Sequence, residues 1–258
     1  MNKIQEFNRL HNSEEILMLG NAWDLLSALT LEKMGFKAIG TTSWGIANSL
    51  GFADGELIDF NRHLDIIKTI ATHVKIPVSA DIEAGYGESA ETIVQNVLRT
   101  ADIGVAGINI EDSMKQQKGL KEIAVHADLL SKIRSSLDHH GFKDFYVNAR
   151  IDTYFQREAP FEETIIRAKA YIESGASGIF VPGLTDYEEI HEMVQAFKVP
   201  LNVLSLPGLT NGKKLKELGV KRFSFGNALS DKVIAVMEKS AAHLLEMKDT
   251  SHLYETVV

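Results

Sequence analysis

Acidic side chains stand at the ends of three apolar segments of this 258-residue sequence, in the motifs Asp81-Ile82-Glu83, Glu111-Asp112 and Arg150-Ile151-Asp152. Carboxylates gathered in one place repel one another, and a hard cation stabilises their ionised forms together. A ligand set made only of oxygen atoms is typical of Mg²⁺ or Mn²⁺. Because these motifs contain no histidine, the sequence predicts a magnesium or manganese site rather than a zinc site.

The spacing of the charged residues indicates that they share one environment. Asp81 and Glu83 are two residues apart, and such residues point to the same side of an extended strand. Glu111 and Arg150 close the next two apolar segments. An isolated Asp-x-Glu pair is more typical of a solvated loop or a helix cap, but matching positions on adjacent strands favour a site. Arg150 either neutralises the carboxylates or binds a carboxylate or phosphoryl group of a substrate in a bidentate fashion.

Hydroxyl and glycine residues follow two of the apolar segments. Thr42 and Ser43 supply hydroxyl groups, and a turn around Gly45 offers backbone N–H donors to an anion. The run Gly85-Tyr86-Gly87 predicts a tight loop that leaves the metal strand, since glycine permits positive φ and close approach.

The elements that must position these residues alternate between two types. Short β-rich segments are apolar throughout, as expected for strands that are buried on both faces of a parallel sheet. We expect strands at Ile16–Asn21, Ala38–Thr42, Val78–Glu83, Gly107–Glu111, Phe145–Ile151, Gly178–Val181, Leu201–Leu204 and Arg222–Phe225. The segments between them have helical periodicity, as in the face made by Phe60, Leu64, Ile67 and Ile70 and in the segments Glu162–Ser174 and Asp186–Phe197.

This alternation predicts an α/β fold, a closed (β/α)₈ TIM barrel that forms a single domain over residues 1–258. An open, doubly wound sheet is the alternative, but no Gly-x-Gly-x-x-Gly motif follows the first strand. In a barrel the carboxyl ends of the strands surround the catalytic mouth, so the charged motifs converge there. The helical tail, about residues 229–258, carries an apolar stripe from Val233 to Leu245. This stripe either contacts another subunit or packs on its own barrel.

The composition excludes several classes of protein. No cysteine is present, which excludes disulfides, thiolate metal sites and cysteine nucleophiles. The net charge of −8 comes without the clustered Lys and Arg of a nucleic-acid surface. The N-terminal stretch has no apolar signal region, and no apolar run approaches the roughly 18 residues of a membrane span. A cytoplasmic protein with no nucleic-acid or membrane partner is therefore expected.

Several other residues are expected to be structural. We expect Trp23 in the core, within the first helix after Asn21, and His126 on a helix surface. We expect the pair His139-His140 to lie in a solvated turn. We expect three lysines to form an exposed face of a loop: Lys115, Lys118 and Lys121. The alternative is that one of them closes over the substrate.

Taken together, the motifs resemble those of the isocitrate lyase / phosphoenolpyruvate mutase superfamily. The resemblance covers roughly residues 21–226, and the order and spacing of its motifs are more specific than any one of them. The matching stretches are Thr42–Gly45, Ser49–Asp54, Asp81–Gly87, Gly107–Ser113, Asn148–Asp152 and Val181–Gly183.

The resemblance implies a (β/α)₈ barrel, usually a tetramer whose subunits exchange C-terminal helices, and a Mg²⁺-dependent reaction on an α-keto acid or related small carboxylate. By position, Asp81 matches the direct metal ligand of the family. Three further acids match residues that hold the water shell of the metal: Asp54, Glu83 and Glu111. Thr42, Ser43 and Trp44 match the segment that holds the substrate carboxylate or ketone, and Arg150 matches an arginine that contacts the substrate.

Departures from the family pattern narrow the choice of reaction. The lyases of the superfamily use a cysteine in a gating loop, and this sequence has no cysteine. The phosphonate-handling mutases and hydrolases have a lysine where Ser113 stands and an Asn-Ser or Asn-Thr pair that is missing here. The sequence therefore favours a Mg²⁺-dependent C–C bond lyase or decarboxylase that acts on a small 2-oxo or 2-hydroxy dicarboxylate through a metal-stabilised enolate. Tyr86 and Glu111 are the candidate bases.

Two other functions remain open at this point. One is P–C bond chemistry on phosphonopyruvate or a carboxyphosphonate, which keeps the metal site but lacks the loop. The other is a non-catalytic binder of metal and carboxylate, suggested by the short loop after Ser113. In each case the expected partners are a small carboxylate and further copies of the chain, in a dimer or tetramer. Whether the loop over residues 114–121 closes on the substrate is also open.

Overall fold

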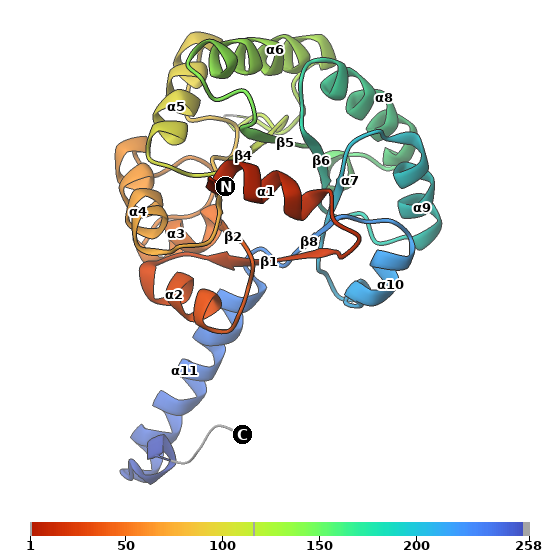
Figure 1. Ribbon diagram of the computed structural model, residues 1–258. Coiled ribbons are helices and arrows are strands. Elements are labelled where there is room, and N and C mark those ends of the chain that lie inside the picture. The colour runs from red at the N-terminus through yellow and green to blue at the C-terminus, as the bar shows by residue number, and fades with distance from the viewer. Residues whose placement is uncertain (1, 116, 255–258) are drawn as a thin grey trace.

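The computed structural model describes residues 2–115 and 117–254, and its centre is a closed barrel of parallel strands (Figure 1). Neighbouring strands follow chain order, and the eighth strand pairs back onto the first. The strands are β1 (Leu17–Ala22), β2 (Ile39–Thr41), β3 (Val78–Asp81), β4 (Gly107–Glu111), β5 (Tyr146–Arg150), β6 (Gly178–Val181), β7 (Leu201–Leu204) and β8 (Arg222–Ser224). The predicted barrel is confirmed, and the open sheet is wrong. Each predicted strand is present, with its ends within about two residues of those expected.

Helices surround the barrel and cover the outward faces of the strands (Figure 1). The predicted apolar face of α4 is buried, as Phe60, Leu64, Ile67 and Ile70 are each less than 9% exposed. The helices are α1 (Lys3–His11), α2 (Leu25–Lys33), α3 (Ser43–Ser49), α4 (Phe60–His73), α5 (Ala90–Asp102), α6 (Ile123–His139), α7 (Thr153–Gln156), α8 (Pro160–Glu173), α9 (Tyr187–Ala196), α10 (Gly212–Glu217), α11 (Ala228–Met247) and the 3₁₀ turn η1 (Ser251–Tyr254).

Helix α1 lies across the barrel opening that is formed by the amino ends of the strands (Figure 1). Asn2 caps the helix by accepting a hydrogen bond from the amide of Gln5. The ring of His11 is fully buried and stacks on Tyr146, with ring centroids 4.0 Å apart. This end of the barrel is therefore plugged by side chains, and the opposite end, at the carboxyl ends of the strands, carries the mouth.

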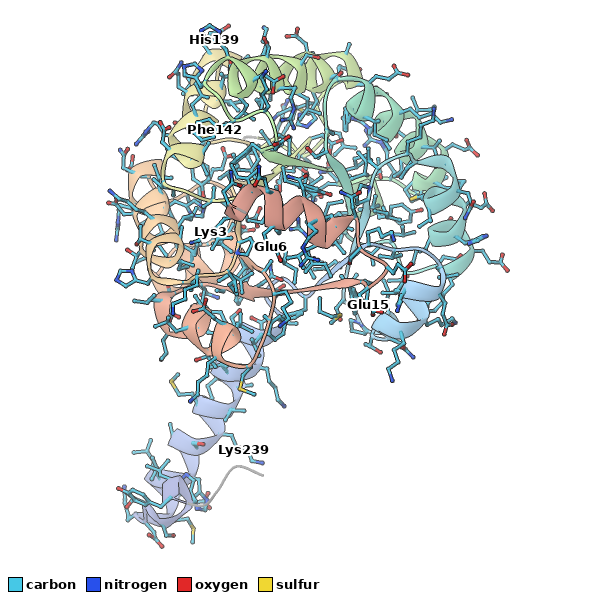
Figure 2. All side chains as sticks on the ribbon, in the orientation of Figure 1. Lys3, Glu6, Glu15, His139, Phe142 and Lys239 are labelled. Carbon is cyan, nitrogen blue, oxygen red and sulfur yellow. The ribbon has the colours of Figure 1, made fainter. Side chains whose placement is uncertain are left out.

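Helix α11 projects away from the barrel, and its side chains around and beyond Lys239 stand clear of it (Figures 1 and 2). Ser230 is the one buried residue among its 20. The apolar side chains of Val236, Met237 and Leu245 are 52%, 64% and 71% exposed. The interpretation that the tail packs on its own barrel is therefore wrong, because the helix leaves the barrel within its first turn. Among the described residues, no helix is both long and apolar enough to cross a membrane.

Two expectations about aromatic residues need correction. His126 does not lie on a helix surface: it is completely buried in α6, because it shares the inward face with Leu129, Leu130 and Ile133. Trp23 packs against the core as expected, but it precedes α2 instead of lying within it. The pair His139-His140 is exposed at the end of α6, as predicted.

Candidate active site

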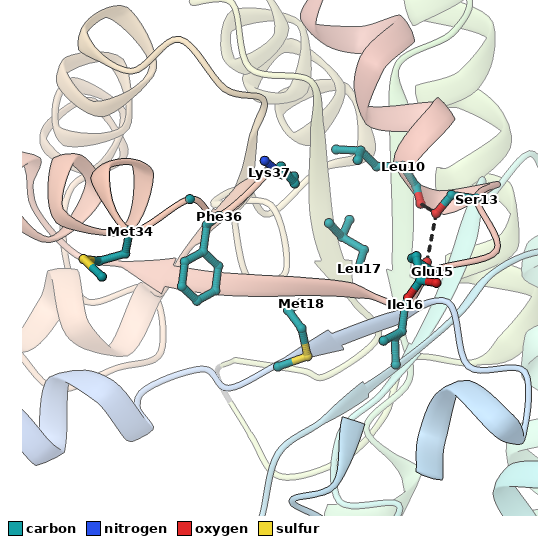
Figure 3. Close-up of a pocket in the computed structure, with 10 residues that line it drawn as sticks. Leu10, Ser13, Glu15, Ile16, Leu17, Met18, Met34, Phe36 and Lys37 are labelled. Atoms are coloured by element: carbon teal, nitrogen blue, oxygen red, sulfur yellow. Dashed lines mark hydrogen bonds between the residues drawn. The ribbon is translucent and has the colours of Figure 1, made fainter. Parts of the chain in front are cut away.

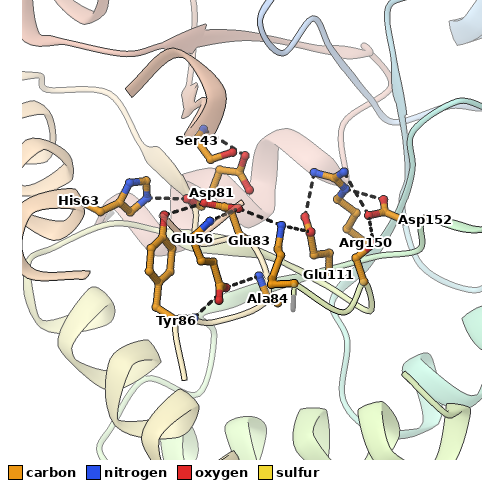
Figure 4. A network of polar contacts seen from close by, with 12 residues as sticks. Ser43, Glu56, His63, Asp81, Glu83, Ala84, Tyr86, Glu111, Arg150 and Asp152 are labelled. Carbon is orange, nitrogen blue, oxygen red and sulfur yellow. Dashed lines mark hydrogen bonds and ion pairs between the residues drawn. The ribbon is translucent and has the colours of Figure 1, made fainter. Parts of the chain in front are cut away.

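The charged residues that close neighbouring strands meet at one end of the barrel (Figure 4). Asp81, Glu111 and Arg150 are the last residues of β3, β4 and β5. In the sheet register, Glu111 lies directly beside Arg150, and Asp81 lies beside Asn109. Parallel strands bring their carboxyl ends to the same edge, so the predicted gathering of these side chains is observed.

Asp81 is held in place from both sides but keeps one oxygen free. Its Oδ2 accepts a hydrogen bond from the amide of Ser43 at 3.3 Å, and its own amide donates to Thr41 Oγ1 at 2.9 Å. His63 Nε2 donates to the Asp81 carbonyl oxygen at 2.9 Å. The remaining oxygen, Oδ1, is buried and has no hydrogen-bond partner among the described residues. A buried carboxylate oxygen without a donor is costly unless a cation or an ordered water completes it.

Glu83 reaches the mouth by a different route from the one predicted. β3 ends at Asp81, so Glu83 lies beyond the strand, with a left-handed φ of 50°. The strand alternation expected for Asp81 and Glu83 is therefore wrong. The carboxylate is nevertheless buried and satisfied, because Oε1 accepts from the Tyr86 hydroxyl at 2.6 Å and Oε2 accepts from the Glu56 amide at 3.0 Å.

Backbone strain is concentrated beside this carboxylate. Among the described residues, four that are not glycine have positive φ, and three of them are Glu56, Glu83 and Tyr86. Such conformations persist where the surroundings hold them, and they cluster at functional sites. Gly85 has a φ of +106°, and a Cβ there would lie 2.4 Å from Ile93 Cγ2, so the predicted need for glycine in this loop is confirmed.

Lys115 occupies the space between two of the predicted metal-site acids. Its Nζ lies 2.5 Å from Glu111 Oε1 and 2.9 Å from Glu83 Oε2, and its side chain is only 18% exposed. Burial works against the charged ammonium, but the two carboxylates outweigh it and raise the Lys115 pKa above its ordinary value. The expectation of an exposed loop face is therefore wrong for Lys115 and for half-buried Lys121, and it holds for Lys118.

Arg150 forms ion pairs on two sides. Its Nη1 lies 2.9 Å from Glu111 Oε2, while Nε and Nη2 donate to the two oxygens of Asp152 at 2.7 and 3.2 Å. Ser113 Oγ donates to Asp152 Oδ2 at 2.5 Å. The structure thus shows the neutralising role considered for Arg150, with a guanidinium plane fixed by a bidentate carboxylate.

The segment Thr42-Ser43-Trp44 begins a helix instead of a free turn. Thr42 is the N-cap of α3, and its Oγ1 accepts from the amide of Gly45 at 3.3 Å. Asp54 follows α3 and is exposed, near Ser43 and the carboxylates of Glu83 and Asp81. Partial desolvation and repulsion from Glu83 and Asp81 raise the pKa of Asp54 to about 6.

Asp112 faces away from the mouth, as its alternation with Glu111 predicts. It is completely buried and accepts hydrogen bonds from Tyr171 Oη at 2.9 Å, Arg167 Nη1 at 3.2 Å and the Asp152 amide at 3.0 Å. Its contacts tie the end of β4 to α8, so its role is to support the site.

The loop after Glu111 crosses the mouth and divides it. Ser113 pairs with Leu120 in a short antiparallel bridge, and Met114 and Lys115, which follow Ser113, border a cavity on each side. A cavity of about 910 Å³ lies on the side of Glu56 and Tyr86, and another of about 960 Å³ lies on the side of Arg150. Lys115 lines both. A smaller pocket, of about 310 Å³, lies among residues such as Leu17 and Phe36 at the amino end of the barrel, away from the acids of the mouth (Figure 3).

Two contributors to the site were missed from the sequence. The carboxylate of Glu56 accepts from the amides of Ala84 and Tyr86, each at 2.9 Å, and so braces the loop after β3. A second acid two residues after Asp54 was the available signal. His63 lies three residues after Phe60 and four before Ile67, so helical periodicity places it on the buried face of α4.

Comparison with known proteins agrees with this architecture. The sequence profile of the phosphoenolpyruvate phosphomutase family matches residues 7–245. The chain belongs to this family. It is 38% identical over 222 residues to an uncharacterised protein of Mycobacterium tuberculosis, a match that covers 86% of this chain and 81% of that protein. It is 28% identical over 224 residues to oxaloacetate decarboxylase 1 of Pseudomonas fluorescens, covering 84% of this chain and 76% of that enzyme.

Solved structures share the fold closely. A Burkholderia cenocepacia protein superposes with a TM-score of 0.92 at 29% identity, covering 99% of this chain and 93% of that one. The 2,3-dimethylmalate lyase of the PEP mutase/isocitrate lyase superfamily superposes with a TM-score of 0.87 at 25% identity, covering 95% and 88%. The predicted superfamily is confirmed, and with it the prediction of an enzyme from a group that includes carbon–carbon lyases.

Proposed function

We propose that the protein is a Mg²⁺- or Mn²⁺-dependent lyase or decarboxylase that breaks a C–C bond in a small 2-oxo or 2-hydroxy dicarboxylate. The observation that carries the proposal is the buried, unpartnered Oδ1 of Asp81 at the end of β3, with Glu83, Glu111 and Arg150 around the same mouth. The likeness to oxaloacetate decarboxylase and to 2,3-dimethylmalate lyase supports this substrate class.

The residues of the mouth fit a hard divalent cation. All the candidate donors are oxygen atoms, and Asp81 Oδ1 is the buried one that lacks a hydrogen-bond partner among the residues that the structure describes. In the described part of the chain, no three His, Asp or Glu residues are grouped tightly enough to form a complete cage. We therefore assign Asp81 as the direct ligand, with Glu83, Glu111 and Asp54 holding water molecules around the ion. Mg²⁺ suits this arrangement because it usually keeps several of its waters.

Each remaining residue has a separate task in this proposal. A bound cation would stabilise the negative charge that develops on the enolate oxygen. Arg150, oriented by Asp152, binds a substrate carboxylate through its guanidinium edge. We assign Thr42, Ser43 and Trp44, at the start of α3 next to Asp81, to hold the ketone or its neighbouring carboxylate.

The two candidate bases differ in their surroundings. Tyr86 donates its hydroxyl proton to Glu83, and burial together with the nearby Glu83 raises its pKa above the ordinary value. Tyr86 therefore stays protonated and acts as a hydrogen-bond donor to Glu83 rather than as a base. Glu111 is an acceptor at the strand end, and we assign it as the base where bond cleavage requires one. Decarboxylation requires no such base, because loss of CO₂ itself leaves the enolate.

The test is a metal-dependent turnover assay. Oxaloacetate, 2,3-dimethylmalate and methylisocitrate are each incubated with the protein and Mg²⁺, and the release of pyruvate or another keto acid is followed. We expect turnover of at least one substrate, its loss with EDTA and its loss in Asp81→Asn. Absence of turnover on all three substrates, or full activity in Asp81→Asn, would refute the proposal.

A second candidate is cleavage or rearrangement of a P–C bond, which is favoured by the family to which the chain belongs. It would use the same acids and Arg150. Ser113 stands where the mutases have a lysine, so we rank it second. Phosphorus NMR of an incubation with phosphonopyruvate distinguishes the two, since a phosphonate and a phosphate ester resonate far apart.

We also propose that the protein is a homo-oligomer, a dimer or tetramer. The exposed apolar side chains of α11 support this, because a helix that leaves its own barrel presents them to another surface.

A further inference from the structure

A lysine ammonium group lies among the acids of the proposed metal site. The ammonium of Lys115 bridges Glu83 and Glu111, which are 2% exposed each, and both carboxylates contact it more closely than 3 Å. In the proposed function, these are two of the acids that hold the water shell of the cation. An ammonium group and a hydrated divalent ion carry like charges, and both seek the same carboxylate oxygens.

The position of Lys115 in the loop makes this contact specific. Lys118, in the same turn, is exposed. Lys121 donates from its Nζ to the carbonyl oxygen of Ala84 at 3.4 Å and is not ion-paired with either acid among the described residues. Of the described lysines in this loop, Lys115 is the one paired with acids of the mouth.

The loop is built so that its tip can separate from the mouth. Its backbone closes on itself, since the amide of Met114 donates to the carbonyl oxygen of Gly119 at 3.0 Å. Gln117 contacts Met114 within the same turn. Among the described tip residues, the polar side-chain contacts with the rest of the barrel are the two ion pairs of Lys115. Breaking these two ion pairs would therefore leave the hydrogen bonds within the turn intact.

We propose that Lys115 is an internal cation that competes with the divalent metal for Glu83 and Glu111. In the metal-free protein the ammonium neutralises these buried carboxylates and draws the loop across the mouth, between its two cavities. Loading of the metal displaces the ammonium from these two carboxylates. This inference rests on the proposed function, because it assumes that the mouth binds a divalent ion.

The competition sets a trade-off between stability without metal and affinity for metal. Without Lys115, two buried carboxylates would face each other with one fewer positive charge nearby, which raises the free energy of the metal-free state. The metal-bound state, in which the ammonium is already displaced, would change less. Removal of the charge at residue 115 should therefore tighten metal binding and lower the stability of the metal-free protein.

The experiment is direct titration of the full-length protein with Mn²⁺, in which free ion is measured by electron paramagnetic resonance. The variants are Lys115→Gln and Lys115→Met, which remove the charge, and Lys115→Arg, which keeps it. Lys118→Met is the matched control in the same loop. We expect the two neutral variants to bind Mn²⁺ about tenfold more tightly than the parent, a difference of about 1.4 kcal/mol. Lys115→Arg and Lys118→Met should stay within about twofold of the parent.

The outcomes separate this inference from the proposed function. If the parent binds Mn²⁺ and Lys115→Gln binds it equally or more weakly, the competition is refuted and the metal site stands. If neither the parent nor any variant binds Mn²⁺, both proposals fail. Thermal unfolding gives a second measurement: Mg²⁺ should raise the melting temperature of Lys115→Gln by more than it raises that of the parent. An equal or smaller rise would also refute the competition.

Discussion

Glu56 and Glu83 hold each other in place through reciprocal contacts between two loops. The amide of Glu56 donates a hydrogen bond to Glu83 Oε2 at 3.0 Å. In return, Glu56 Oε1 accepts hydrogen bonds from the amides of Ala84 and Tyr86, which lie in the loop that carries Glu83. Both glutamates have left-handed backbone conformations. The pairing of the loops therefore offsets strain in each of them and fixes the direction of the Glu83 carboxylate.

This pairing predicts losses of different size for two substitutions of Glu56. Glu56→Ala removes both acceptor contacts and should lower the free energy of unfolding by about 2–3 kcal/mol. It should also weaken Mn²⁺ binding, because Glu83 loses its fixed orientation. Glu56→Gln keeps an acceptor oxygen and should lose less than half as much stability. Urea unfolding and Mn²⁺ titration check both effects, and equal stability of the two variants would contradict the proposed brace.

Arg150 is predicted to act through the shape of its guanidinium group. Arg150→Lys keeps the charge but cannot pair with Asp152 in a bidentate fashion, so KM for the dicarboxylate should rise roughly tenfold or more. Steady-state kinetics, with kcat and KM separated, measures this. An unchanged KM would show that Arg150 serves only to neutralise Glu111 and Asp152.

Ser113 is predicted to position Arg150 without touching the substrate. Its hydroxyl donates to Asp152 Oδ2 and accepts from Gln156 Nε2 at 2.9 Å. Ser113→Ala should raise KM by a smaller factor than Arg150→Lys, and Ser113→Thr should recover most of the loss. If Ser113→Ala abolished kcat with KM unchanged, the hydroxyl would have a direct part in the chemistry.

The buried histidines predict loss of stability in mild acid. Burial and the nearby Arg222 lower the pKa of His11 to about 3, and burial lowers the pKa of His126 well below its ordinary value. Each stays neutral in the folded protein but binds a proton on unfolding once the pH falls below about 6.5. The stability they contribute is therefore complete above pH 6.5. Below it, the free energy of unfolding should fall by up to about 1.4 kcal/mol per pH unit for each histidine, until the pH reaches the folded-state pKa.

His126→Leu isolates one of these contributions. Neither ring nitrogen of His126 has a hydrogen-bond partner among the described residues, so replacement by an apolar side chain breaks no such bond. Urea unfolding between pH 5 and pH 7 should show a slope reduced by about one proton. The exposed His139→Gln serves as the control. A slope that is the same in His126→Leu as in the parent would contradict the prediction.

Assembly through α11 predicts a sensitive apolar surface on that helix. Val236→Glu places a charge among its exposed apolar side chains and should dissociate the oligomer, as measured by size-exclusion chromatography with light scattering. Glu238→Gln, on the opposite side of the helix, should leave the assembly intact. A monomeric parent protein would contradict the prediction.

The sequence was most informative about the regular parts of the barrel. Strands such as β4 and β6 are buried along their whole length and rich in apolar residues, and this pattern predicted their ends correctly. Asp81, Glu111 and Arg150 could be placed at the mouth for the same reason, because they end consecutive strands. Periodicity also predicted the buried face of α4.

Long-range contacts and irregular backbone could not be predicted in this way. The left-handed φ of Glu83 depends on Glu56, which lies 27 residues earlier and has no signal in the local pattern. Lys115 looked solvated because its partners come from two different strand ends. His126 was predicted to be exposed because histidine is polar, although its position in the sequence places it on the inward face of α6. In each case tertiary packing outweighed the local preference of the residue.

The isolation of α11 has a consequence for how the chain exchanges its amide hydrogens with solvent. A helix of 20 residues extends about 30 Å, and one without tertiary contacts is only marginally stable in water and opens within microseconds. In a lone subunit, its amides beyond Val233 would take up deuterium almost as fast as a free peptide, whereas those of the barrel strands would wait for global unfolding. The protection of these amides against exchange therefore measures the free energy by which contact with another surface stabilises the helix.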